Sequence, residues 1–272
     1  MTERKGTPMT VLDNGIALER IEDGVLRGRT VPEWANMVGP FGGITAAVLV
    51  RAIELQSDVH GQPVALTANY LAPIVDGPFE ISARAVRTNR TNQHWYVELS
   101  QDREVKTTAT AVFGPRRDTW GDTELVRPSA PAPEDVPAGG AGPTWMSNYD
   151  MRYVTGGIPG ETDGESDSSE TLLWLRDNPA RPWDFASLAA ACDVFYPRVF
   201  RRLGRMLPAG TISFTVYFHA DTETLAAQGT GHVLARARAQ QFSAGHFDQS
   251  AQLWATDGAL LATSHQIVYF KG

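Results

Sequence analysis

The sequence of 272 residues has almost no sulfur chemistry and few histidines. Its single cysteine, Cys192, excludes an internal disulfide and fits a reducing compartment. No two of the six histidines stand at the short spacing that is typical of metal ligands. We therefore expect neither a bound metal nor a cofactor.

Long apolar runs and excess positive charge are also missing. The most apolar stretch, residues 44–50, is far shorter than the roughly 20 residues that span a bilayer, and the start MTERKGTPMTVLDNG lacks the apolar core of a signal peptide. Lys and Arg total 24 against 31 Asp and Glu, a formal charge of −7, which argues against a nucleic-acid partner. We expect a cytoplasmic protein without membrane insertion.

The first half of the sequence has a clear order of patterns. Residues 15–30 alternate apolar and polar side chains around Asp23-Gly24, which indicates a β-hairpin. After Gly-Pro-Phe-Gly-Gly (39–43), an apolar stretch without proline predicts a buried helix over residues 44–55. Four β-rich runs follow, which predict an antiparallel meander: residues 64–71, 79–88, 94–101 and 105–113.

Two segments have the composition of connections. Residues 116–145 are rich in Pro, Ala and Gly and are predicted to link two domains. Residues 156–169 (GGIPGETDGESDSS) are polar and acidic, as in a surface loop.

The second half repeats the order of the first. A helix is predicted over residues 185–203, with Pro197 expected to kink or end it. The remaining strand-like runs surround this helix: residues 148–154, 170–176, 211–219, 232–242, 247–255 and 259–270.

Local similarity supports a duplication. Residues 67–72 (TANYLA) parallel residues 215–220 (TVYFHA) at an offset of 148, and residues 106–113 parallel 261–268 at an offset of 155. One long helix wrapped by a curved antiparallel sheet is the hotdog arrangement, an α+β fold. We therefore predict a double hotdog of two tandem domains, residues 1–115 and 146–272, joined by the linker 116–145.

Several segments resemble the type II (TesB-like) acyl-CoA thioesterases, which are double hotdog proteins. In the first half these are FGGITAA (41–47), NYLAP (69–73) and the meander 86–113. In the second half they are ACDV (191–194), TISFTVYFH (211–219) and DGALLATSHQ (257–266). The match covers most of both halves and fails over the linker and the loop 156–169. Ser213 and Phe214 depart from the family, whose better-studied members tend to have Asp and His there.

The resemblance implies an acyl-CoA substrate, hydrolysed to free acid and CoA, and a catalytic set of Asp193, Thr211 and Gln266. An aspartate can accept a proton from water, and a hydroxyl and an amide can hold that water in place. Gly42 and Gly43 open the first helix, whose free N–H groups we expect to face Asp193 and to bind the thioester oxygen as it becomes an oxyanion.

Structural roles stay open for these residues. An aspartate in an apolar helical stretch is often a cap or an ion-pair partner, and Gly42-Gly43 also suits a tight turn or close packing. The first half has Thr45 and Ala111 near the positions equivalent to Asp193 and Gln266, so we expect the two hotdogs to be unequal. In an alternating strand His265 should face away from Gln266.

Other functions remain to be weighed. A hydratase of the same fold would need a histidine near Asp193, which the sequence lacks, and no G-x-S-x-G motif of a serine esterase is present. A catalytically silent double hotdog that binds acyl-CoA or a lipid-like ligand is the alternative that remains. The arginines of 84–90, 116–117 and 198–205 are either CoA-phosphate ligands or solvated surface residues. We expect a homodimer or a larger homo-oligomer.

Overall fold

The computed structural model describes residues 9–140, 142–160 and 164–272. Residues 161–163 of the predicted surface loop, residue 141 of the predicted linker and the first eight residues of the chain lie outside this range.

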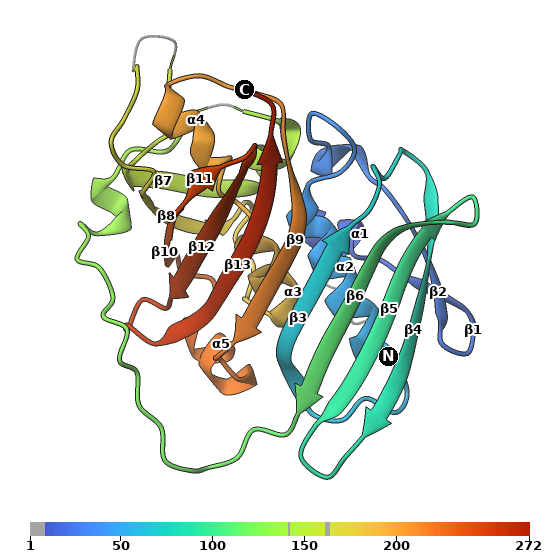
Figure 1. Ribbon diagram of the computed structural model, residues 1–272. Helices are drawn as coiled ribbons and strands as arrows, with labels where there is room; N and C mark the ends of the chain where they lie inside the picture. The colour runs from blue at the N-terminus through green and yellow to red at the C-terminus, as the bar shows by residue number, and fades with distance from the viewer. Residues whose placement is uncertain (1–8, 141, 161–163) are drawn as a thin grey trace, which may run out of the picture.

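The first half contains the predicted hairpin, long helix and meander, preceded by a short helix that the sequence did not predict (Figure 1). The hairpin turns at Asp23-Gly24, where Gly24 has a positive φ of +73° that suits glycine. The elements are α1 (Val11–Gly15), β1 (Glu19–Glu22), β2 (Val25–Arg29), α2 (Gly42–Glu54), β3 (Gln62–Tyr70), β4 (Pro78–Thr88), β5 (Gln93–Gln101) and β6 (Glu104–Gly114).

The second half follows the same plan with additions. Its extra helix α5 is preceded by Asp221, whose side chain accepts a hydrogen bond from the Thr224 amide and so caps the helix. The elements are β7 (Tyr149–Thr155), β8 (Thr171–Asp177), α3 (Phe185–Ala191), α4 (Arg198–Leu203), β9 (Ala209–Phe218), α5 (Thr222–Gln228), β10 (Val233–Arg238), β11 (Phe242–Ser243), β12 (His246–Trp254) and β13 (Leu260–Phe270).

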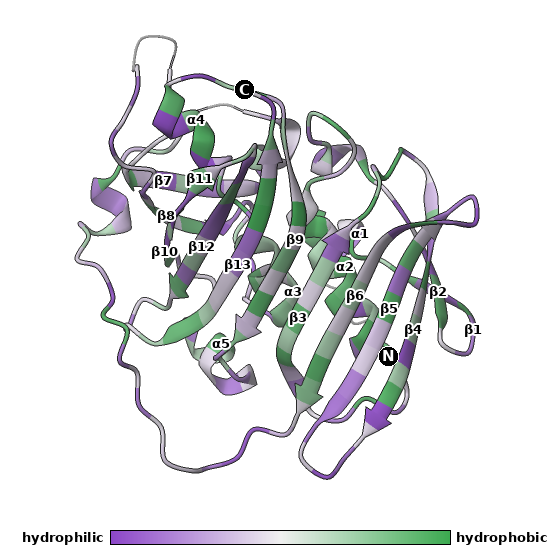
Figure 2. Cartoon of the chain, in the orientation of Figure 1, coloured by the Kyte–Doolittle hydropathy of each residue, from purple (hydrophilic) through white to green (hydrophobic). Residues whose placement is uncertain are grey.

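The described strands form one antiparallel sheet, in which each half contributes one side. The order is β1-β2-β4-β5-β6-β3 in the first half and β9-β13-β12-β10-β8-β7 in the second, with β11 paired to β12. Helices α2 and α3 pack together on one face of this sheet (Figure 1), and hydrophobic α2 lies behind the strands (Figure 2). Each half is thus a hotdog, and the two are joined edge to edge.

The join between β3 and β9 has local two-fold symmetry. Thr67 lies opposite Thr215, with their hydroxyl oxygens 3.0 Å apart, and the flanking pairs Ala65–Tyr217 and Asn69–Ser213 are equidistant from this centre. When a two-fold axis relates two equivalent antiparallel strands, only the residue at the axis lies opposite its own equivalent. The separation of Thr67 and Thr215, 148 residues, equals the offset of the sequence repeat.

The single helix predicted over residues 185–203 is wrong, because the structure has two. Helix α3 ends at Ala191 and α4 begins at Arg198, directly after Pro197. Proline has no amide hydrogen to donate and disfavours a helical residue before it, which agrees with the expectation that Pro197 would kink or end the helix. Asp193 lies in the turn between the two helices.

The strand predicted over residues 232–242 is too long, since β10 ends at Arg238. The carboxylate oxygen Oδ1 of Asp248 accepts hydrogen bonds from the amides of Gln240 (3.0 Å) and Gln241 (2.8 Å). These amides therefore leave the strand ladder, and the chain turns into the short strand β11.

Part of the connecting segment 116–145 packs on the outer face of the second half. Val136 forms a buried apolar cluster with Leu172, Trp174 and Leu234, and the Trp174 indole donates to the Pro131 carbonyl at 2.8 Å. This segment therefore covers apolar residues that the outer side of β8 and β10 would otherwise expose. Within the described residues no helix is long and apolar enough to cross a membrane.

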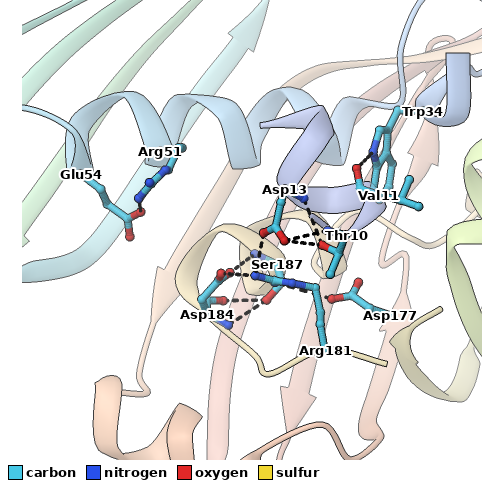
Figure 3. Close-up of polar contacts among 10 residues, drawn as sticks. All are labelled: Thr10, Val11, Asp13, Trp34, Arg51, Glu54, Asp177, Arg181, Asp184 and Ser187. Carbon is cyan, nitrogen blue, oxygen red and sulfur yellow. Dashed lines mark hydrogen bonds and ion pairs between the residues drawn. The ribbon is translucent and has the colours of Figure 1, made fainter. Parts of the chain in front are cut away.

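An ion cluster around Arg181 ties α1 to the second half (Figure 3). Its guanidinium lies 2.7 Å from Asp184, 3.3 Å from Asp13 and 3.7 Å from Asp177. Asp184 also caps α3 through the Ser187 amide, and Asp13 closes the cap of α1 with Thr10. One arginine thus serves three carboxylates on three elements.

The buried Asp177 should give the protein a stability that falls as pH rises. Burial raises the pKa of this carboxyl from 3.8 to about 7, although Arg181 opposes the shift. Its contribution is therefore complete below about pH 4 and is lost through about pH 7. We expect Asp177→Asn to flatten this fall, measured as the free energy of unfolding in urea at a series of pH values.

Asp13→Asn is the matched control, because the pKa of Asp13 is shifted in the opposite direction. Burial raises the pKa of Asp13, but the hydrogen bonds from Thr10 and the charge of Arg181 outweigh it, so the pKa is lowered. Its contribution is present at neutral pH and is lost in acid. An Asp177→Asn variant with the wild-type pH slope would contradict the prediction.

Candidate active site

Asp193 lies at the boundary between the two halves of the protein. It follows the end of α3, and its amide donates to the Ala190 carbonyl at 3.1 Å, which continues the helical turn. Its side chain keeps some exposed surface, although protein surrounds the carboxyl group. Burial raises the pKa of Asp193 from 3.8 to about 7, while hydrogen bonds from Gln266 and the Gly43 amide oppose the rise.

The structure brings the three predicted residues into one hydrogen-bonded chain. The hydroxyl of Thr211 donates to Oε1 of Gln266 at 2.9 Å, and Nε2 of Gln266 donates to Oδ1 of Asp193 at 2.7 Å. The residues come from β9, β13 and the turn after α3. Gln266 is buried and its amide is satisfied at both ends in this order, which fixes its orientation.

A bulge in β9 turns Thr211 toward Gln266. Phe214 lies opposite Gln266 and Ser213 opposite Ile267, but Val268 pairs with Thr211, so Ile212 is skipped. Without this extra residue Thr211 would share the outward face of Ser213, because side chains alternate along a strand. The bulge therefore places the hydroxyl on the buried side of the sheet.

The N-terminus of α2 reaches Asp193 from the other half. The Gly43 amide donates to the Asp193 carboxylate, and a Cβ atom on Gly42 would lie only 2.7 Å from Oδ2 of Asp193. Phe41, which precedes this helix, supplies no side-chain cap. Asp193 thus caps a helix of the opposite half, where the helix dipole favours a negative charge.

Aromatic packing fixes this helix end. Phe41, directly before α2, stacks on Trp145 of the segment leading into β7, with ring centroids 4.0 Å apart and an interplanar angle of 6°. Trp34 also stacks on Phe41, with ring centroids 6.3 Å apart. Such pairs add about 1 kcal/mol each to area burial, so the helix end is held from both halves.

The equivalent position in the other half lacks these polar groups. The strand registers of the two halves match, since Ala111 pairs with Leu66 as Gln266 pairs with Phe214. By the same offsets, Pro63 corresponds to Thr211 and Thr45 to Asp193. The arrangement therefore occurs once, which agrees with the expected inequality of the two hotdogs.

His265 and two of the arginines that were considered from the sequence take no part in this hydrogen-bonded chain. His265 is exposed on the outer face, opposite to Gln266, as its place in the strand predicts. Arg198 is fully buried and donates to the Ser169 carbonyl and the Thr171 hydroxyl, and Arg116 donates to carbonyls of both halves at the β3–β9 join. These two arginines therefore hold the fold together. Among the described residues no group of three metal-ligating side chains occurs.

One residue beside the site was missed from the sequence. The hydroxyl of Tyr70, the last residue of β3, donates to the Gly42 carbonyl at 2.9 Å. Tyr70 lies within the segment 69–73 that carries the family resemblance. Its spacing alone gives no reason to connect it with Gly42, because the contact arises only when the helix packs on the sheet.

An apolar cavity of about 20 Å³ adjoins α2 on the side of the first half. Ile44 and Thr45, which directly follow Gly43, line it together with Trp34, Val48 and Leu99. This volume holds about one water molecule. A larger group can enter only if these side chains move.

Comparisons with known proteins agree with this architecture. The sequence matches the family described as acyl-CoA thioesterase N-terminal domain over residues 31–114 and the acyl-CoA thioesterase C-terminal domain over residues 126–270. Together the two matches cover more than half of the chain. No curated protein matches the sequence.

Solved structures share the fold. A conserved protein of unknown function with a hotdog fold from Alicyclobacillus acidocaldarius is 47% identical, with a TM-score of 0.92 over 97% of this chain and 98% of that one. The tesB protein of Mycobacterium avium subs paratuberculosis is 18% identical, with a TM-score of 0.79 over 96% and 98% of the two chains. The acyl-CoA thioesterase II TesB2 of Mycobacterium marinum is also 18% identical, with a TM-score of 0.75 over the same shares.

The two glycines of α2 should respond differently to alanine. A Cβ atom on Gly43 would lie 2.4 Å from the Phe41 ring and 2.6 Å from the Ala190 carbonyl, so Gly43→Ala should lower the melting temperature. On Gly42 the near atoms are Oδ2 of Asp193 at 2.7 Å and the Tyr70 hydroxyl at 3.5 Å. Gly42→Ala should therefore keep most of the stability and displace the Asp193 carboxylate.

Thermal unfolding and a ¹³C NMR titration of the Asp193 carboxyl measure the two effects. Gly121→Ala is the control, because a Cβ atom there meets no atom within 4 Å. An unchanged Asp193 titration in Gly42→Ala would show that the carboxylate does not depend on this close approach.

Proposed function

The chain belongs to the acyl-CoA thioesterase family and is a thioester hydrolase, and we propose that it hydrolyses acyl-CoA with a water molecule activated by Asp193, Gln266 and Thr211. One observation carries the proposal: the hydrogen-bonded chain from Thr211 through Gln266 to Asp193, which ends on the N-terminus of a helix from the other half. Acyl-CoA as the substrate is the chemistry that the name of the matching family describes.

Asp193 is the base in this scheme. A carboxyl group with a pKa of about 7 is substantially ionised near neutrality and is basic enough to accept a proton from water. As the proton moves to Asp193, the water oxygen attacks the thioester carbonyl carbon and forms a tetrahedral intermediate. The C–S bond then breaks, the sulfur takes the proton from Asp193, and free acid and CoA leave.

Gln266 and Thr211 place the water. Gln266 donates one amide hydrogen to Asp193 and has a second one for the water or the developing oxyanion. The Thr211 hydroxyl donates to Gln266, so its oxygen is free to accept a hydrogen bond from the water. No covalent acyl-enzyme is needed, and no cysteine, serine or histidine takes part.

The helix end stabilises the negative charges of the reaction. The Gly43 amide is engaged by Asp193, which modifies the expectation that both glycines bind the oxyanion. In this proposal Gly43 holds the base, and the amide of the partly buried Gly42 donates to the thioester oxygen. An anion at a helix N-terminus is favoured by about 0.3–1 kcal/mol at the surface and up to about 2 kcal/mol when partly buried.

Replacing the base tests the proposal. We expect Asp193→Asn to lower kcat for release of CoA thiol by roughly 10² to 10⁴, the usual contribution of a general base. The measurement is thiol release over a panel of acyl-CoA chain lengths. Asp76→Asn is the matched control, since Asp76 is exposed and outside the site.

Two results would contradict the assignment. Unchanged turnover in Asp193→Asn would remove Asp193 from catalysis. Binding of acyl-CoA by the wild-type protein without hydrolysis of any chain length would favour the silent double hotdog.

The pH dependence of turnover gives a separate prediction. Because the ionised carboxylate is the base, kcat/KM should rise with pH and level off above about 7, the pKa of Asp193. Gln266→Leu removes a hydrogen bond that stabilises the ionised form, so its acid limb should move to higher pH and its plateau should fall. A wild-type profile that falls with rising pH in this range would exclude Asp193 as the base.

A further inference from the structure

Two hydrogen bonds meet on one peptide group beside Asp193. The Tyr70 hydroxyl donates to the Gly42 carbonyl at 2.9 Å, and the Gly43 amide donates to the Asp193 carboxylate. The carbonyl of residue 42 and the amide of residue 43 belong to the same planar peptide unit. Tyr70 and Asp193 therefore bind opposite ends of one rigid dipole.

We infer that Tyr70 is a positioning residue that holds and polarises the Gly42–Gly43 peptide, and through it stabilises the catalytic base Asp193. The inference rests on the proposed function of Asp193. It adds a residue of the first half to a set that otherwise comes from the second half, apart from the glycines themselves.

The chemistry of the peptide group explains the effect. A hydrogen bond accepted by a carbonyl increases the polarity of the attached N–H, so consecutive bonds strengthen each other. The Gly42 carbonyl also lies in the first turn of α2, which its N-cap residue Phe41 does not cap with a side chain. Tyr70 thus adds a polar contact to a helix end that otherwise depends on the aromatic packing around Phe41.

Tyr70 is suited to act as a permanent donor. Burial, and next the charge of Asp193, raise the pKa of its hydroxyl well above the usual value, so it stays protonated. Its ring comes from the end of β3, the strand at the join of the two halves, and a ring has few rotatable bonds. The hydroxyl position is therefore set by the sheet.

The pseudo-symmetry separates the role of the hydroxyl from that of the ring. Phe218 is the equivalent of Tyr70, because Tyr70 pairs with Thr107 as Phe218 pairs with Ala262. Phe218 is buried against Phe185, so an aromatic ring without a hydroxyl is sufficient for packing at this position.

The partners of the hydroxyl are absent from the symmetry-related site as well. Ala190-Ala191 stand at the place of Gly42-Gly43, and Thr45 stands at the place of Asp193. The hydroxyl, the glycine pair and the carboxylate thus occur together at one of the two symmetry-related sites, and all three are replaced at the other. A hydroxyl needed only for the fold would have no reason to follow the carboxylate.

Tyr70→Phe tests the inference through the pH profile of kcat/KM for acyl-CoA hydrolysis. Loss of the hydroxyl weakens the Gly43 bond to the ionised carboxylate, so the acid limb should move to higher pH by about 0.5 unit. Well above that limb the variant should keep turnover within about threefold of wild type. Tyr217→Phe, on the exposed outer face of β9, should leave the profile unchanged.

A second variant separates polarity from shape. Tyr70→3-fluorotyrosine keeps the ring and makes the hydroxyl a stronger donor, so the acid limb should move to lower pH. Opposite shifts in the two variants support the inference, whereas unmoved limbs in both overturn it. If these limbs do not move while Asp193→Asn is inactive, only the role of Tyr70 fails; if Asp193→Asn stays active, the proposed function itself fails.

Discussion

The antiparallel pairing of β3 with β9 determines most of this structure. Its centre at Thr67 and Thr215 relates the two halves by a local two-fold rotation, which brings α2 and α3 together on one face of the sheet. The N-terminus of α2 then lies against the C-terminal end of α3. A helix start with unpaired N–H groups thereby meets a turn that carries a carboxylate, and neither half contains both.

This symmetry does not require two sites, because each polar group depends on its own residue type and local backbone geometry. Thr211 faces inward only because the bulge at Ile212 shifts the register of β9 against β13. The first half has the same register shift between Pro63 and Ala65, but a proline occupies the position of the threonine. The backbone geometry is therefore duplicated while the chemistry is not, and the first half contributes a helix end and Tyr70 instead.

Much of the architecture was predictable from the sequence. The features that could not be predicted share a physical cause. The long helix after Gly43 and the meander strands follow from local periodicity, and the repeat offsets of 148 and 155 agree with the observed registers. The order Asp193, Thr211, Gln266 was available from resemblance. The bulge, the contact between Tyr70 and Gly42, and the cluster at Arg181 were not, because each depends on distant segments packing together. The end of α3 at Ala191, before Pro197, was not predicted, since a local pattern shows the proline but not where the preceding helix ends.

The position of Asp193 links stability to activity. A carboxylate that caps a helix of the opposite half stabilises the contact between the halves when it is ionised, yet burial raises its pKa to about 7. Stronger hydrogen bonds would favour the ionised form and make it a weaker base, while weaker ones would leave it protonated at neutral pH. The two donors, Gln266 and the Gly43 amide, therefore set a balance between holding the halves together and accepting a proton. A base in this position can therefore be tuned from either half.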